Sequence, residues 1–87
     1  FIDETKSHIQ TLQILRATKN YTEILSILHV IKGNAGSFGF TILSSKAANI
    51  EVCIKENRLE ETDSGLDDFL KYSDFLLRDY QRLLKID

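Results

Sequence analysis

Residues 24–39 read ILSILHVIKGNAGSFG, and this stretch decides the fold. Its apolar positions advance by four, three, four and three residues, which is the spacing of one face of an α-helix. The members of this stripe are Ile24, Leu28, Ile31, Ala35 and Phe38. The same stretch holds one of the two histidines of the chain and three of its four glycines. It therefore predicts a helix with one core-facing stripe and an unusual outer face.

The outer face carries a histidine and two glycines. At about 100° per residue, His29 lies about 140° from Ile24 and points away from the core. Gly33 and Gly36 project on the same side, and Lys32 lies between that side and the core. A glycine inside a helix costs about 1 kcal/mol relative to alanine. Local stability does not explain these glycines, so we expect another molecule to approach the backbone here.

The residues flanking this helix predict its ends. Asn20 followed three residues later by Glu23 is similar to a capping box, although asparagine replaces the usual serine or threonine. Gly39 is placed to end the helix as a left-handed cap, and Thr41 to start the next one.

Three further helices are predicted. The first covers about Asp3–Thr18 with Asp3 as its cap, the third covers about Ile42–Asn57, and the last begins at Ser64 after a polar loop, Asn57–Asp63. Their stripes are Ile2, Ile9, Leu12 and Leu15; Leu43, Ala47, Ile50 and Ile54; and Leu66, Phe69, Leu70, Ser73, Leu76, Leu77, Tyr80, Leu83 and Leu84. Short connections favour antiparallel neighbours. The expected fold is all-α, an antiparallel up-down four-helix bundle formed by residues 1–87 as one domain.

Composition agrees with a small helical domain and excludes several functions. The chain has 87 residues, 43% of them apolar and 28% charged, with no proline and a net charge of −2. Lysine and arginine are scattered, which argues against nucleic-acid binding. A single cysteine, Cys53, excludes an internal disulfide and fits a reducing compartment. No apolar run reaches the ~20 residues that span a bilayer. The start at Phe1, without methionine, predicts a piece of a longer protein.

The outer face suits chemistry on a phosphoryl group. Neutral imidazole is a nucleophile near neutral pH, and a carboxylate that binds one ring N–H leaves the other nitrogen free to attack. Glu51 is the candidate carboxylate for His29, if the second and third helices pack side by side in antiparallel register. Lys32 can meet the charge of the phosphoryl group. At Gly33 a side chain would lean over the imidazole and obstruct access to it. Gly36 extends this area without side chains by another turn, so that a partner's loop could lie against the backbone.

These residues form a recognisable set, which is His29, Lys32, Gly33, Ala35, Gly36, Gly39 and Glu51. The set resembles the histidine-containing phosphotransfer (HPt) domains of two-component signalling. The segment Gly36–Phe40 is similar to the version at the front of chemotaxis histidine kinases. The resemblance is close over Leu28–Ile54 and rests on length and pattern elsewhere. Leu28 departs from it, because many members have alanine before the histidine, and this should alter packing rather than chemistry.

The resemblance implies a phosphocarrier in a phosphorelay. His29 would accept a phosphoryl group on its outer ring nitrogen from an aspartate of a response-regulator receiver domain, or donate one to it. Lys32 would stabilise this group, Gly33 would permit close docking, and Glu51 would orient the histidine. Lys55, a turn after Glu51, would touch the phosphoryl group or the partner.

The sequence also indicates what the chain lacks. It carries no nucleotide-binding motif, so we expect no kinase activity and no cofactor of its own, and Mg²⁺ would belong to the receiver. It would act in the cytoplasm, either alone or as a domain of a membrane-anchored sensor kinase, with a receiver or a kinase catalytic domain as partner. Neither nucleic acid nor membrane is an expected partner. The sequence leaves open the partner's identity, the direction of flow, the upstream signal, the parent protein and the oligomeric state.

The sequence leaves two other functions open. The chain could be the substrate domain of a chemotaxis-type kinase, phosphorylated from ATP by a separate domain. It could also be a bundle that docks proteins without transferring phosphate, and His29→Gln would leave that function intact.

Single residues have alternative readings too. Gly33 and Gly36 could permit close helix contact, Lys32 and Lys55 could be solvated, and Glu51 could be an ordinary surface carboxylate. Leu25 could belong to an apolar docking patch or to the edge of the bundle. His8 has no companion motif, and His8, His29 and Cys53 lack the spacing of a metal site.

Overall fold

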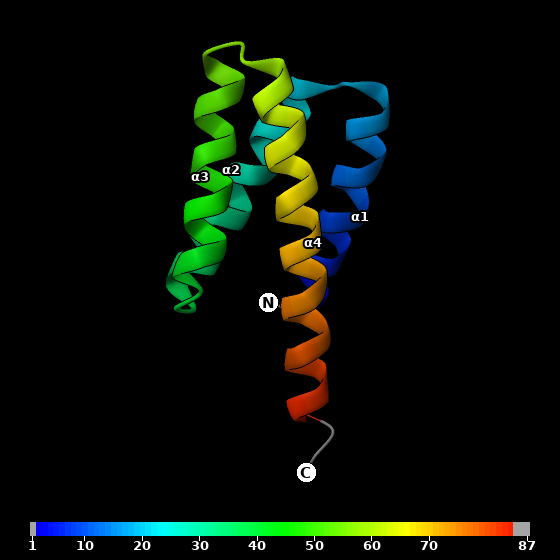
Figure 1. Cartoon of the computed structure of the whole chain (residues 1–87). Coiled ribbons are helices and arrows are strands. Elements are labelled where there is room, and N and C mark those ends of the chain that lie inside the picture. The colour runs from blue at the N-terminus through cyan, green and yellow to red at the C-terminus, as the bar shows by residue number, and fades with distance from the viewer. Residues whose placement is uncertain (1, 85–87) are drawn as a thin grey trace.

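Four antiparallel helices form the domain. The computed structural model describes residues 2–84, with side chains for residues 3–79. The helices are α1 (Ile2–Thr18), α2 (Tyr21–Ser37), α3 (Thr41–Lys55) and α4 (Leu59–Leu84). Figure 1 shows that consecutive helices run in opposite directions and that α4 extends beyond the other three. The contacting pairs are α1 with α2, α2 with α3, α3 with α4, and α1 with α4. The predicted four-helix bundle is confirmed.

The core lies where the four apolar stripes meet. Its buried members are Leu12; Ile24, Leu28, Ile31 and Ala35; Leu43, Ala47 and Ile50; and Leu66 and Phe69. Leu15, Ile54, Leu70 and Leu76 are partly buried against it. The prediction for Phe38 was wrong, because this side chain is 64% exposed. Helix α2 ends at Ser37, so Phe38 lies in the turn and has left the face of the stripe. The predicted stripe positions Ile2, Tyr80, Leu83 and Leu84 fall outside the described side chains.

All three connections use the same backbone closure. Each contains one residue of positive φ, and the N–H of the next residue donates to a carbonyl five residues earlier, which is the Schellman arrangement. The residues of positive φ are Lys19, Gly39 and Asn57, and the bonds are Asn20 to Leu15 (3.0 Å), Phe40 to Ala35 (2.8 Å) and Arg58 to Cys53 (2.9 Å). The predicted left-handed cap at Gly39 is confirmed, with φ of 84°. The Asn20 cap is confirmed as well, since its side chain accepts from the Glu23 N–H at 3.4 Å.

The predicted connection between the last two helices was wrong. Helix α3 ends at Lys55 and α4 begins at Leu59, so most of the predicted polar loop is helical and Ser64 lies inside α4. The left-handed conformation of Asn57 reverses the chain at once, and Thr62 then donates to the Arg58 carbonyl from both its N–H (2.9 Å) and its hydroxyl (2.8 Å).

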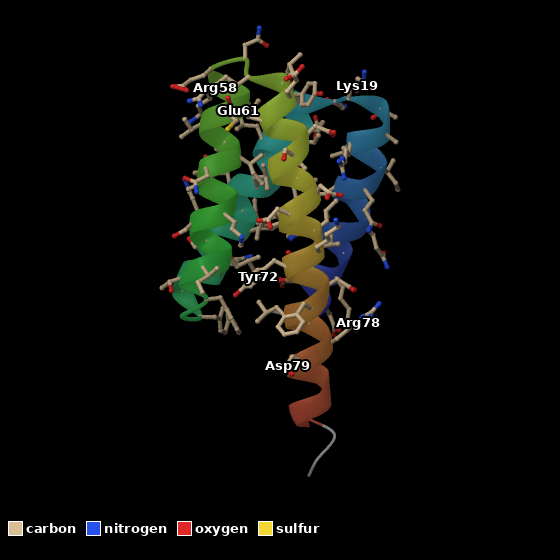
Figure 2. The ribbon with its side chains drawn as sticks, in the orientation of Figure 1. Lys19, Arg58, Glu61, Tyr72, Arg78 and Asp79 are labelled. Carbon is tan, nitrogen blue, oxygen red and sulfur yellow. The ribbon has the colours of Figure 1, made fainter. Side chains whose placement is uncertain are left out.

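The acidic residues of that stretch suit a helix start. Glu60 and Glu61 lie in the first turn of α4, where negative charge is favourable. Arg58 forms an ion pair with Glu61 at 2.7 Å, and Figure 2 shows both at this end of the bundle.

The predicted cap at Asp3 differs from the structure, because Asp3 lies inside α1, in its first turn. Thr41 starts α3 as predicted and is its first helical residue, while the cap position is Phe40, which makes no side-chain capping bond.

At Gly65 helix α4 packs closely against α3. A Cβ built on Gly65 would lie 3.1 Å from Ile50 Cγ1, closer than most such contacts allow. The neighbouring residue would have to move for any side chain to fit. The role of Gly65 could not be predicted from the sequence, because it depends on Ile50, which lies 15 residues earlier in the chain on another helix.

Charged side chains join α1 to α4. Arg16 Nε lies 2.9 Å from Asp63 Oδ1, and Arg16 Nη1 lies 3.6 Å from Asp67 Oδ1. The hydrogen bond from Arg16 holds the pKa of the Asp63 carboxyl below its ordinary value. The pKa of Asp67 is lowered too, first by the hydrogen bond from Lys71 and then by Arg16.

These lowered pKa values predict a loss of stability in acid. A carboxyl with a lower pKa in the folded state contributes stability above its unfolded pKa, about 3.9, and loses it as the pH falls through the folded value. We therefore expect the free energy of unfolding in urea to fall between about pH 5 and pH 2, and to fall less in Asp63→Asn. Both side chains are exposed, so the difference should be small. If the free energy of unfolding fell equally with pH in the wild type and in Asp63→Asn, the stabilising effect of the Arg16–Asp63 pair would be contradicted.

Candidate functional site

The α2–α3 pair brings three of the predicted residues together. Glu51 on α3 lies between His29 and Lys32 on α2. Its Oε1 atom is 3.8 Å from His29 Nδ1, and its Oε2 atom is 3.4 Å from Lys32 Nζ. The second contact is a hydrogen bond of an ion pair, whereas the first is longer than a hydrogen bond. One carboxylate therefore faces both α2 side chains, each with a different oxygen.

The three side chains differ sharply in exposure. The Glu51 side chain is 6% exposed, that of Lys32 is 34% exposed and that of His29 is 73% exposed. Glu51 is therefore not an ordinary surface carboxylate. A buried carboxylate needs a cation or hydrogen-bond donors, and Lys32 supplies the cation. Within the described part of the chain, Glu51 Oε1 has no hydrogen-bond donor.

The imidazole has one sheltered and one open side. Nδ1 is the ring nitrogen that faces the carboxylate. Because the two ring nitrogens lie on different edges of the ring and most of the side chain is exposed, Nε2 remains on the solvent side. A ring rotation that shortens the 3.8 Å separation would let Nδ1–H donate to Glu51 Oε1. The arrangement can thus hold one tautomer and leave Nε2 free to react.

The glycines of α2 do not mark a tight helix contact. A Cβ built on Gly33 would meet nothing within 4 Å, and one on Gly36 would lie 3.6 Å from Ser44 Oγ, an ordinary contact distance. The close-packing reading of Gly33 was therefore wrong. At Gly33 the surface beside His29 is open.

Two predicted partner-binding residues lie around this group. Leu25 is half-buried in α2, one turn before His29, and Lys55 is exposed in the last turn of α3, one turn after Glu51. Neither is joined to the His29 group by an ion pair or hydrogen bond that the structure describes. By helical spacing, Leu25 neighbours His29 on α2 and Lys55 neighbours Glu51 on α3.

One residue at the site was missed in the sequence. The Ser44 hydroxyl donates to the Lys32 carbonyl at 3.0 Å, across the α2–α3 interface. A serine at the edge of an amphipathic helix gives no signal of such a bond.

Other predicted features of the chain can be placed as well. His8 and Cys53 are half-buried, and Cys53 is a free thiol. Among the side chains that the structure describes, no group of three or more histidine, cysteine or acidic residues could hold a metal ion. No described helix has an apolar stretch long enough to cross a membrane.

Comparison with known proteins bears on the whole chain. No solved structure matches it. The family model described as "Hpt domain" matches residues 1–85, nearly the full length. This match includes both helices of the site and the two helices that the sequence related to the family only by length and pattern. The chain therefore belongs to the Hpt domain family, the helical phosphocarriers of two-component signalling.

Proposed function

We propose that His29 is the residue that carries the phosphoryl group, in exchange with an aspartate of a response-regulator receiver domain. The observation that supports this most is the buried Glu51 carboxylate beside an exposed imidazole. Burying a carboxylate is unfavourable without a partner, and a structural role alone would not require a nucleophile next to it.

Each of the three side chains has a role in the proposed transfer. The lone pair of His29 Nε2 attacks the phosphorus of the aspartyl phosphate, the new N–P bond forms, and the P–O bond to the aspartate breaks so that its carboxylate leaves. The ring becomes positively charged and keeps its proton on Nδ1, where Glu51 stabilises it. Lys32, at the edge of the same group, offsets the negative charge of the phosphoryl oxygens.

The surroundings of His29 suit a docked partner. Gly33 and Gly36 have no side chains that would project from α2 toward a partner. Leu25 would supply an apolar contact with the partner, and Lys55 a basic one. The receiver's acidic pocket would hold the Mg²⁺ that the transfer needs. The domain itself would need no cofactor.

The proposal is tested by incubation with a phosphorylated receiver domain, followed by intact mass. Gain of one acid-labile phosphoryl group is the expected result. No gain from several receivers, with clear gain from a chemotaxis-type kinase domain and ATP, would instead support the kinase-substrate alternative. No gain from either donor would leave a docking module.

Gly33 provides a separate prediction about docking. A side chain here meets open space and improves helix propensity, so Gly33→Ala and Gly33→Leu should each raise the free energy of unfolding, by up to about 1 kcal/mol. The leucine side chain leans toward the preceding turn and covers His29. We expect transfer at least about tenfold slower in Gly33→Leu than in Gly33→Ala, in rapid-quench assays. Equal rates would show that the partner does not approach over Gly33.

A further inference from the structure

Helix α3 holds Lys32 at two points. The Lys32 side chain is bound by Glu51, with Lys32 Nζ 3.4 Å from Glu51 Oε2. The Lys32 backbone carbonyl accepts a hydrogen bond from the Ser44 hydroxyl at 3.0 Å. Ser44 and Glu51 are seven residues apart, which places them two turns apart on one edge of α3. A single residue of α2 is thus fixed to α3 both through its main chain and through its charge.

The Ser44 bond restrains a movement that apolar packing leaves easy. The apolar part of the α2–α3 interface consists of aliphatic side chains and alanines, whose attraction is not directional. A hydrogen bond requires a defined distance and angle, so the bond from Ser44 to Lys32 fixes the axial register of α3 against α2. The separation of Glu51 Oε1 and His29 Nδ1, 3.8 Å, depends on this register.

The space around Ser44 agrees with this role. Ser44 is half-buried, and the facing residue of α2 is Gly36, where even an added Cβ would lie at 3.6 Å from the hydroxyl oxygen. The hydroxyl therefore reaches the carbonyl without crowding from Gly36.

We propose that Ser44 is a positioning residue for phosphoryl transfer. Its hydroxyl holds α3 in register with α2 and thereby keeps the Glu51 carboxylate between His29 and Lys32. This inference rests on the proposed function of His29. Among the described residues, no hydrogen bond joins the Ser44 hydroxyl to His29, so its effect on the imidazole is indirect.

The test compares three variants of the chain. Ser44→Ala removes the hydroxyl, and Ser44→Thr keeps it. Thr62→Val removes a different hydroxyl, on a fully buried residue, which donates to the Arg58 carbonyl at 2.8 Å, away from the site. Each is measured for thermal stability, for the rate of phosphoryl transfer from a phosphorylated receiver, and for the ¹⁵N chemical shifts of the His29 ring.

We expect transfer about fivefold slower in Ser44→Ala, equivalent to ~1 kcal/mol, with altered ¹⁵N shifts at His29. Ser44→Thr should restore both, and Thr62→Val should lose stability while keeping the wild-type rate and shifts. Wild-type shifts in Ser44→Ala, or an equal slowing in Thr62→Val, would overturn the proposal.

The failure of this inference is distinguishable from that of the proposed function. If wild-type protein accepts phosphate and Ser44→Ala does so at the same rate, only the positioning role fails. If wild-type protein accepts none, the function of His29 fails, and the ring shifts still decide whether Ser44 sets the geometry of His29 and Glu51.

Discussion

His29→Gln is expected to abolish phosphoryl acceptance and to leave the bundle folded. Glutamine is polar and similar in reach, but its amide nitrogen has no free lone pair with which to attack phosphorus. The His29 side chain is 73% exposed and lies outside the core, so the free energy of unfolding should change by no more than about 0.5 kcal/mol. Intact mass before and after incubation with a phosphorylated receiver measures the first effect, and urea unfolding measures the second.

The second histidine supplies the matched control. His8 lies in α1, whereas the group around Glu51 lies on α2 and α3. His8→Gln should therefore accept one acid-labile phosphoryl group, as the wild type does. Retained labelling of His29→Gln, with the label lost in His8→Gln, would move the phosphorylated residue to α1 and refute the proposed site.

Local signals were sufficient to predict most of the fold. The stripe from Ile24 to Ala35 repeats at the helical period, and Gly39 supplies the left-handed residue that ends α2. Both features depend only on residues near them in the sequence. The helix count and the order of the helices followed from such features.

The connection from α3 to α4 could not be predicted in the same way. Asn57 adopts φ of 58°, which glycine adopts far more readily, so this asparagine was only a weak signal for a tight reversal. The polar residues that follow then resemble a loop. One of them, Thr62, is fully buried although it is polar. The packing of α4 decides this, and a local pattern does not reveal it.

The site shows the same division between local and long-range information. The spacing on α2 predicted that His29 points outward with Gly33, and Glu51 was selected on condition that α3 packs beside α2. The sequence alone did not reveal that the Glu51 side chain is only 6% exposed or that it also contacts Lys32, because both depend on how the helices pack. Ser44 and Gly65 have their roles only through residues on another helix, and neither had any signal in the sequence.

The largest effect on stability is expected for Phe69→Ala. Phe69 is fully buried on α4 and belongs to the core cluster that all four helices share. Removing a buried phenylalanine side chain costs about 3–5 kcal/mol, through lost apolar burial and the cavity that remains. The free energy of unfolding of native domains is about 5–15 kcal/mol in total. A domain this small buries a modest share of its surface, which limits its stability. Thermal unfolding should show a midpoint lower by at least about 12 °C.

Phe75→Ala is the matched control, because it makes the same chemical change on the same helix. The Phe75 side chain is 67% exposed, so its loss should change the free energy of unfolding by no more than about 0.5 kcal/mol. Similar losses in both variants would contradict the core assignment. Phe69→Ala leaves His29, Lys32 and Glu51 in place, so well below its unfolding midpoint it should still accept a phosphoryl group from the receiver. Its acceptance should fall on warming in parallel with the folded fraction, whereas that of His29→Gln should be absent at every temperature.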